Sequence, residues 1–336
     1  MKPNRALVVP TCALACASLM GATQASAGSF RYTKLRLAGE NTVSATGVDD
    51  KDQVVGSYRD RKGDYHGFVW DKGAFTQVDV GTALIAVTAK GLALGEGTLD
   101  FTYDIATGQQ QTLEKIYYEL RGQGISGRGV VVGGASRSPH PKGQGFIAKA
   151  NGKHIELLTV PGNMFQTFAR GINDAGVVVG DDQPTKGAAS GFMYQSGTYT
   201  SFNPPGAVMT YPTFITDDGV AGGYYIDASG QQHGFTMTGG VFTTIDPPGA
   251  TFSSVIGIGP AGEVVGTFAG GSNLYSGFIE QGGTFYSINV PGEAETFIQA
   301  VNAKGSLVGN YWVSDNNDVQ FGFIARCSAD QSPCTQ

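Results

Sequence analysis

The residues most able to bind a ligand include one arginine inside a strand-like run. Arg170 lies in "TFARGIN", where a guanidinium either binds an anionic group such as a uronate or is satisfied by strand carbonyls. At the equivalent positions of the sequence repeat stand Thr46, Ile85, Gln123, Thr213, Ile256 and Gln299. We therefore expect a largely polar ring at this level, with Arg170, Gln123 and Gln299 as candidate binding residues.

Four charged and aromatic segments are the other candidates. They are "YRDRKGDYH" (58–66), "YYELRGQ" (117–123), "SRSPHPKGQ" (136–144) and "YWVSDNNDV" (311–319). We expect them on one face of the fold, with Arg59, Tyr117, His140 and Trp312 contacting a ligand. The alternative is that these variable loops are simply solvated.

No known catalytic or metal motif occurs in the chain. HExxH, GxSxG, a P-loop and paired CxxC are all absent. Acidic pairs such as Asp49-Asp50, Asn173-Asp174 and Asp217-Asp218 fall where hairpin turns are needed and lack the ligand series of a calcium loop. His66 and His233 occupy repeat positions, which favours packing or strand-edge hydrogen bonding over catalysis. The sequence thus predicts neither a metal nor a cofactor.

A seven-fold repeat must position these residues. Its anchor is the glycine that ends each "VVG"-like run, and the anchors are Gly56, Gly95, Gly133, Gly180, Gly223, Gly266 and Gly309. The residue eight positions earlier is always Val or Ile, and the residue four positions earlier is glycine in every unit except at Asp52. Each unit has short runs rich in Val, Ile, Phe, Tyr and Thr between Gly-containing turns, which predicts four strands. Such units predict an all-β, seven-bladed β-propeller.

The ends of the chain predict how the ring closes. The seventh unit stops after its third strand, and "YTKLRLAGENTVSATGV" near the N-terminus aligns with "YSINVPGEAETFIQAV". We expect this N-terminal strand to complete the last blade, which removes unpaired edges. Six of seven inner strands have Gly or Ala nine positions before the anchor, as close packing near an axis requires. Third-strand aromatics are expected to fill the wider outer gap, at Phe68, Phe146, Phe192, Phe235, Phe278 and Phe323.

The unit resembles the bacterial extracellular HAF-repeat family. The resemblance rests on "GINDAGVVVG" (171–180) and on the triplets His66-Gly67-Phe68 and His233-Gly234-Phe235, and it covers nearly all of the predicted mature chain. Glycine replaces the family's alanine, and only two units keep the histidine. The resemblance implies an exported repeat protein and brings no activity or catalytic residues.

Residues 1–27 read as a secretory signal peptide. Lys2 and Arg5 precede an apolar run, and Ala25-Ser26-Ala27 provides a small-residue cleavage site. A lipoprotein signal through Cys16 is the weaker alternative. Cleavage would change the net charge from −6 to −8, which disfavours nucleic acid and anionic lipid as partners. We expect a periplasmic or secreted monomer without a membrane span.

The remaining cysteines predict one disulfide that closes a small loop near the C-terminus. Cys327 and Cys334 stay after cleavage, and in an oxidising compartment they most simply form one disulfide after a propeller domain over 28–326.

Two functions fit the sequence. The first is a non-catalytic binding module for a glycan or an envelope or surface protein. The second is a polysaccharide hydrolase or lyase, in which Asp60, Asp64, Glu119 and Asp315 supply acid and base beside Arg170. Convergence of carboxylates on Arg170 distinguishes the second from the first.

Overall fold

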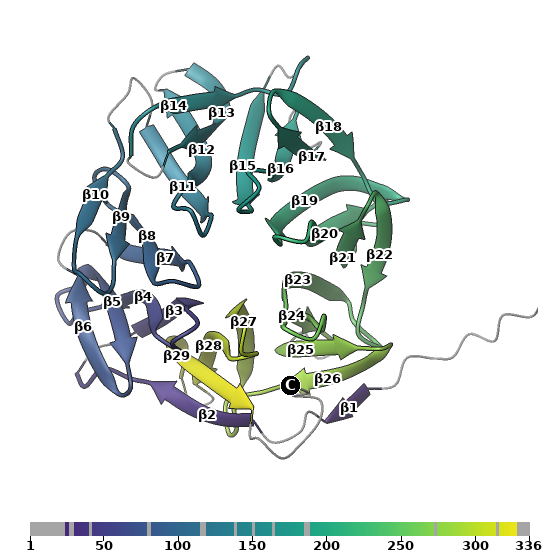
Figure 1. Cartoon of the computed structure of the whole chain (residues 1–336). Helices are drawn as coiled ribbons and strands as arrows, with labels where there is room; N and C mark the ends of the chain where they lie inside the picture. Colours follow the sequence, from purple (N-terminus) through teal and green to yellow (C-terminus); the bar gives the residue numbers. More distant parts are fainter. Residues whose placement is uncertain are drawn as a thin grey trace, which may run out of the picture.

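The computed structural model describes residues 24–26, 30–39, 42–78, 82–114, 119–137, 140–149, 152–162, 165–184, 189–271, 274–313 and 316–327. Their regular structure is entirely β, and four-stranded antiparallel groups are arranged around a central opening (Figure 1). Across these residues, no helix is long and apolar enough to span a membrane.

Three of the sheets have four strands each. One comprises β3 (Thr42–Val48), β4 (Val54–Arg59), β5 (Tyr65–Asp71) and β6 (Ala74–Val78). Another comprises β7 (Ala83–Val87), β8 (Leu92–Glu96), β9 (Phe101–Asp104) and β10 (Gln110–Thr112). The third comprises β27 (Glu295–Val301), β28 (Leu307–Val313), β29 (Asn316–Cys327) and β2 (Phe30–Leu35).

Two larger sheets each contain two such antiparallel groups, linked by one parallel residue pair. In the first, one group comprises β11 (Glu119–Ile125), β12 (Val131–Arg137), β13 (His140–Ala148) and β14 (Ile155–Leu158). The other comprises β15 (Gln166–Ile172), β16 (Val178–Gln183), β17 (Ser190–Gln195) and β18 (Thr198–Phe202). Gly143 of β13 pairs with Gln166 of β15 and links the two groups. In the second, one group comprises β19 (Ala207–Ile215), β20 (Ala221–Asp227), β21 (Gln232–Thr238) and β22 (Val241–Ile245). The other comprises β23 (Phe252–Ile258), β24 (Val264–Ala269), β25 (Tyr275–Gln281) and β26 (Thr284–Ile288). Gln232 of β21 pairs with Phe252 of β23 and links the two groups. A short strand, β1 (Gln24–Ser26), runs parallel to β26 and falls within the predicted signal peptide.

The first long strand of the chain pairs with the last one. All six residues of β2 pair antiparallel with β29, from Phe30 opposite Cys327 to Leu35 opposite Gly322. Leu35 is buried beneath this pairing. Cys334 lies outside the described residues, so the disulfide to Cys327 stays a prediction.

Each anchor glycine lies opposite a third-strand phenylalanine. Gly180 pairs with Phe192, for example, and Gly95 pairs with Phe101 in the unit whose third-strand aromatic the sequence analysis did not identify. These phenylalanines are almost completely buried. A methyl group on Gly180 would lie 1.9 Å from the carbonyl oxygen of Phe168, so no larger residue fits at this position. The glycine repeat therefore reflects close strand packing as well as turn geometry.

The inner strands, which border the central opening in Figure 1, each contain a β-bulge. At the same repeat position of each strand the pairing register skips a residue, and β19 has a second irregularity between Ala207 and Met209. The residues skipped at the shared position are Thr46, Ile85, Gln123, Arg170, Thr213, Ile256 and Gln299. These are the residues that the sequence repeat aligns with Arg170. A bulge leaves its residue outside the hydrogen-bonded ladder and redirects the side chain, so the residue type at this position can differ between units.

Candidate functional site

Arg170 is held by a buried carboxylate. Its Nε donates a hydrogen bond to Oδ1 of Asp181 on the neighbouring strand β16. The Asp181 side chain is completely buried, whereas 29% of the Arg170 side chain is exposed. Gln183 Nε2 donates to the other carboxylate oxygen of Asp181 at 3.1 Å. The expectation that strand carbonyls satisfy Arg170 is therefore not what the described residues show.

Two aromatic rings flank the guanidinium. The Cζ of Arg170 lies 5.5 Å from the ring centroid of Phe168 and 6.0 Å from that of Tyr211, within the range of cation–π contacts. Tyr211 stacks in turn on Tyr224, with centroids 5.0 Å apart. We call Phe168, Arg170, Asp181, Tyr211 and Tyr224 the Arg170 cluster. Its rings and ion pair restrict the arginine to one orientation.

A proline explains why the ion pair forms here. In two other units the residue after the anchor glycine accepts a hydrogen bond from the next inner strand: Asn310 Oδ1 from Ala45 N at 2.8 Å, and Thr267 Oγ1 from Ile298 N at 3.0 Å. Asp181 occupies this position after Gly180, but the corresponding residue of the next strand is Pro212, which has no N–H. Arg170 supplies the donor that the proline lacks.

A pocket of about 300 Å³ adjoins the Arg170 cluster. It lies between the neighbouring groups that begin with β11 and β15, and Phe168 belongs to both the pocket and the cluster. The pocket is lined by Arg121, Gln123, Gly134, Ala135, Ser136, Gly143, Gln166 and Phe168. We call it the Gln123 pocket. Its lining combines one aromatic ring with amide, hydroxyl and guanidinium groups, which are typical of sites for small polar ligands.

A glycine in β12 brings the two sides of the pocket together. A methyl group on Gly134 would lie 3.1 Å from the Phe168 ring, so the ring rests directly against this backbone. The other units have Ser, Glu, Asp, Tyr, Thr or Asn at the equivalent position. The absence of a side chain at Gly134 therefore lets Phe168 form one wall of the pocket.

Buried Asp100 fixes the strand that carries Arg121 and Gln123. Its Oδ2 accepts a hydrogen bond from Gly122 N at 2.5 Å. The pKa of the Asp100 carboxyl is raised to about 6, because burial and, to a smaller extent, nearby Glu96 outweigh the lowering by the Gly122 hydrogen bond and by Arg121. Asp100 is only 2% exposed and bonds to the backbone, so it positions the pocket strand and is not accessible to a ligand.

The structure brings together two of the seven predicted binding residues. Gln123 and Arg170 lie on adjacent inner strands, since a methyl group on the next residue, Gly124, would lie 2.7 Å from the Arg170 carbonyl oxygen. Gln299 is an exposed bulge residue of β27 and does not line the pocket.

The other four predicted binding residues lie elsewhere or cannot be described. Arg59 donates to the Gly63 carbonyl at 3.2 Å and lies over the Tyr65 ring. Trp312 is a half-buried residue of β28, opposite Glu295. Tyr117 and the His140 side chain lie outside the described residues.

Among the described residues, the carboxylates predicted for catalysis do not converge on Arg170. Asp60 closes its own hairpin loop by accepting hydrogen bonds from Lys62 N and Asp64 N, and it also contacts His66. Glu119 is an exposed residue at the start of β11. Asp315 lies outside the described residues. The carboxylate beside Arg170 is Asp181, which sequence reasoning did not select.

The acidic hairpin turns bond to the backbone, as expected. Asp49 Oδ1 accepts hydrogen bonds from the amides of Lys51 and Gln53. Asp217 Oδ1 accepts from Asp174 N at 2.7 Å and thereby links two neighbouring turns. In the described part of the chain, no three His, Cys, Asp or Glu side chains gather in a group able to hold a metal ion.

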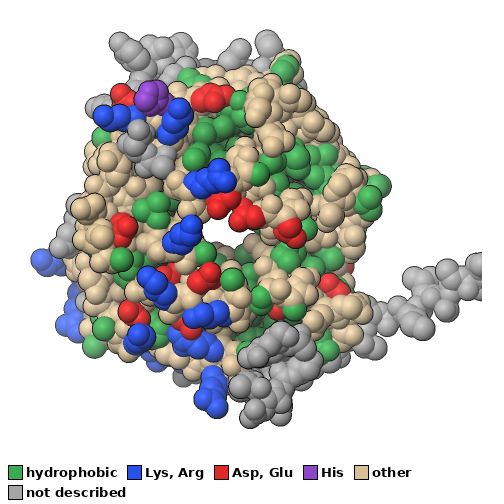
Figure 2. Space-filling model, viewed as in Figure 1, with side chains coloured by type: hydrophobic (Ala, Val, Ile, Leu, Met, Phe, Trp, Pro, Cys, Tyr) green, Lys and Arg blue, Asp and Glu red, His purple; other side chains and the backbone are tan. Residues whose placement is uncertain are grey.

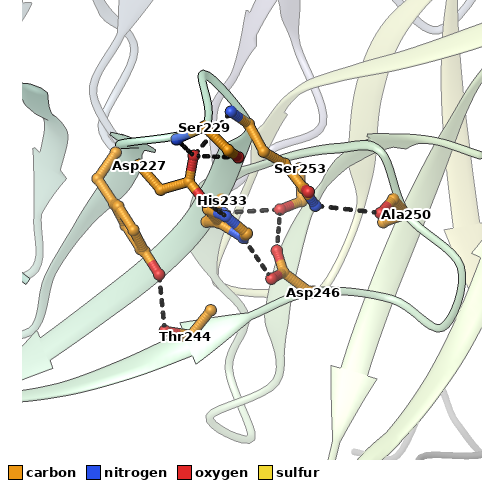
Figure 3. A network of polar contacts seen from close by, with 10 residues as sticks. Asp227, Ser229, His233, Thr244, Asp246, Ala250 and Ser253 are labelled. Carbon is orange, nitrogen blue, oxygen red and sulfur yellow. Dashed lines mark hydrogen bonds and ion pairs between the residues drawn. The ribbon is translucent and has the colours of Figure 1, made fainter. Parts of the chain in front are cut away.

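His233 lies at the centre of a polar network outside this region (Figure 3). Its Nδ1 contacts Asp246 Oδ2 at 2.7 Å and its Nε2 contacts Asp227 Oδ2 at 3.4 Å, while its ring stacks on Tyr225. Asp246 also accepts the hydroxyl hydrogen bond of Ser253. Because the serine donates to the aspartate and not to the histidine, the trio lacks the order of a nucleophilic triad. The network joins β21 to the first strand of the next group.

The network should make stability depend on pH. Burial lowers the pKa of His233, but its hydrogen bonds and charge interactions with Asp246 and Asp227 outweigh this effect and raise it above the usual 6.5. The stabilising contribution is therefore complete below pH 6.5 and is lost as pH rises through the raised value. We expect the melting temperature of wild type to fall over this range relative to that of His233→Gln, which does not titrate. If the melting temperatures of the two proteins change by the same amount from pH 6 to 8, the stabilising contribution assigned to protonated His233 is wrong.

The charges visible on one face are mixed. Acidic and basic side chains both surround the central opening in the view of Figure 2. This face does not show the single-sign field that recruits nucleic acid.

Comparisons with known proteins place the fold. No family model and no curated protein matches the sequence. An oligogalacturonate lyase from Vibrio parahaemolyticus superposes with a TM-score of 0.60 and 9% identity, covering 91% of this chain and 99% of that one. The β-propeller domain of the Trilobed protease from Pyrococcus furiosus gives 0.59 and 11%, covering 88% and 98%. A puromycin-hydrolysing peptidase from Mycobacterium tuberculosis gives 0.58 and 11%, covering 86% of this chain and 53% of that chain. The likeness shows a β-propeller fold and no shared activity.

Proposed function

We propose that the protein is a non-catalytic binding module that takes a glycan at the Gln123 pocket and the Arg170 cluster. The observation that carries this proposal is the composition of the pocket wall: one aromatic ring beside two glutamines and an arginine. Sugars present apolar C–H faces that pack on rings and hydroxyl groups that bond to amides and guanidinium groups. A protein ligand at the same face is the other binding function. Binding of an oligosaccharide in the titrations below would favour the glycan, and absence of binding to every oligosaccharide would favour the protein ligand.

Catalysis is the alternative function. This alternative is a polysaccharide hydrolase or lyase, in which Arg170 could neutralise a substrate carboxylate; the similarity to an oligogalacturonate lyase is one of fold alone. The described carboxylates argue against it, because Asp181 is fully buried and engaged with Arg170, and Asp100 bonds to the backbone. Release of reducing ends or of unsaturated products from any bound saccharide would favour the enzyme.

We further propose that the antiparallel groups form seven blades and that β2 closes the ring by completing the group of β27 to β29. The β2–β29 pairing and the repeat of 43 residues between the last four anchors support this arrangement. Export after cleavage near Ala27, a periplasmic or extracellular location and membership of the HAF-repeat family are parts of the same proposal. The signal-like N-terminus and the His-Gly-Phe triplets support them.

Substitution of Gln123 should weaken glycan binding. Gln123 is exposed in the pocket and loses its amide and one methylene in Gln123→Ala, so we expect the Kd to rise about tenfold, which corresponds to about 1.4 kcal/mol. The measurement is calorimetric titration with the best ligand from an array of neutral and acidic oligosaccharides. Gln299→Ala is the matched control, because Gln299 occupies the same repeat position outside the pocket. Equal losses in both variants, or unchanged affinity in Gln123→Ala, would place the site elsewhere.

A further inference from the structure

The charges around the site point to the kind of saccharide that it takes. We propose, on the basis of the proposed glycan-binding function, that the site selects uncharged saccharides over acidic ones and that Asp181 sets this preference. With Arg170 considered alone, the sequence left an anionic group open as one possible ligand. The ion pair with Asp181 changes the argument.

Asp181 opposes an anionic ligand without touching one. Its side chain is completely buried, so it stays behind Arg170 while a ligand occupies the exposed side of the guanidinium. A carboxylate brought to Arg170 would therefore meet a pair whose net charge is close to zero. The cost of desolvating the ligand carboxylate would be offset by little Coulomb attraction, because repulsion from Asp181 cancels much of the attraction to Arg170.

The other arginine of the site is also close to carboxylates. Arg121 lines the Gln123 pocket and lies within electrostatic range of Asp100, which Glu96 approaches as well. Two cations thus face at least three carboxylates across the region. Because both arginines have acidic neighbours, the pocket lacks the excess positive charge that a uronate-binding site needs.

The same arrangement suits hydroxyl groups. The Nη atoms of Arg170 have no hydrogen-bond partner among the described residues, so they are available as donors in a fixed orientation. Gln123 adds an amide that can both donate and accept, and Phe168 adds an aromatic ring to the pocket wall on which sugar C–H groups can pack. A saccharide without charge satisfies these groups and avoids the repulsion from Asp181.

The first test compares matched saccharides on wild type. Each pair is a neutral chain and the same chain carrying carboxylates at C6: methyl-esterified and free oligogalacturonate, cello-oligosaccharide and its C6-oxidised form, and malto-oligosaccharide and its C6-oxidised form. We expect the neutral member of at least one pair to bind about tenfold more tightly, with a Kd that is insensitive to sodium chloride. Tighter binding of the acidic member overturns the inference and leaves the proposed function intact. Absence of binding to any member overturns the proposed function.

The second test changes the charge behind Arg170. Asp181→Asn keeps the shape and one acceptor oxygen but removes the negative charge, so the preference should shift toward the acidic member by about tenfold. Asp218→Asn, on an exposed turn, is the control and should leave the preference unchanged. If Asp181→Asn fails to fold, the salt dependence of binding to wild type still decides: an affinity for the acidic member that falls steeply with salt contradicts the inference. An unchanged preference in folded Asp181→Asn also overturns it.

Discussion

Replacement of Gly180 by alanine should destabilise the protein by about 3 kcal/mol or more. The added methyl would lie 1.9 Å from the Phe168 carbonyl oxygen and 3.0 Å from the Ala169 Cα. Both obstacles are backbone atoms of the paired strand β15, so relief requires the hairpin to open and not merely a side chain to rotate. The same strand carries Arg170, and we therefore expect binding to decline along with stability.

The effect is measured as the shift of the thermal or urea unfolding midpoint. Gly271→Ala is the matched control, because a methyl group there meets nothing within 4 Å and the backbone is not in the left-handed region. It should change the free energy of unfolding by less than about 0.5 kcal/mol. Equal midpoints for Gly180→Ala and wild type would show that the packing at the anchor glycine is looser than the structure describes.

Removal of β2 should have a comparably large effect. A chain that begins at residue 38 lacks the six backbone pairs to β29 and the buried side chain of Leu35. It also lacks the contacts of Lys34 Nζ with Glu293 at 2.5 Å and of Arg36 Nε with Tyr311 Oη at 2.8 Å. Loss of Leu35 burial alone costs about 2 kcal/mol, and an exposed edge of β29 favours aggregation.

The comparison protein begins at residue 28 and keeps β2. We expect the shorter protein to be largely insoluble or to melt at least about 10 °C lower, given several kcal/mol of lost interactions. A synthetic peptide of residues 30–39 should restore part of the melting temperature by adding the missing strand. Identical melting of the two proteins would mean that β2 does not close the ring.

The sequence by itself determined most of the fold. Hairpins form between neighbouring segments, so their strands and turns depend on local patterns that the repeat makes visible. The all-β architecture, the four-strand unit over 166–202 and the pairing of the N-terminal strand with the last strand were all expected from residue types and spacing. The structure describes each of them.

The candidate site depended on tertiary structure. Arg170 was selected from the sequence, but its meaning depends on Asp181 across the hairpin and on Tyr211 from the next unit. The bulge in β15 and the missing N–H of Pro212 bring these groups together, and neither effect follows from the period of the repeat. The two consecutive aspartates after Gly180, with a proline one unit later, are the signal that could have revealed the pair. Residue types therefore located the bulge position that carries Arg170, while contacts between units decided the charge around it, on which the proposed ligand preference rests.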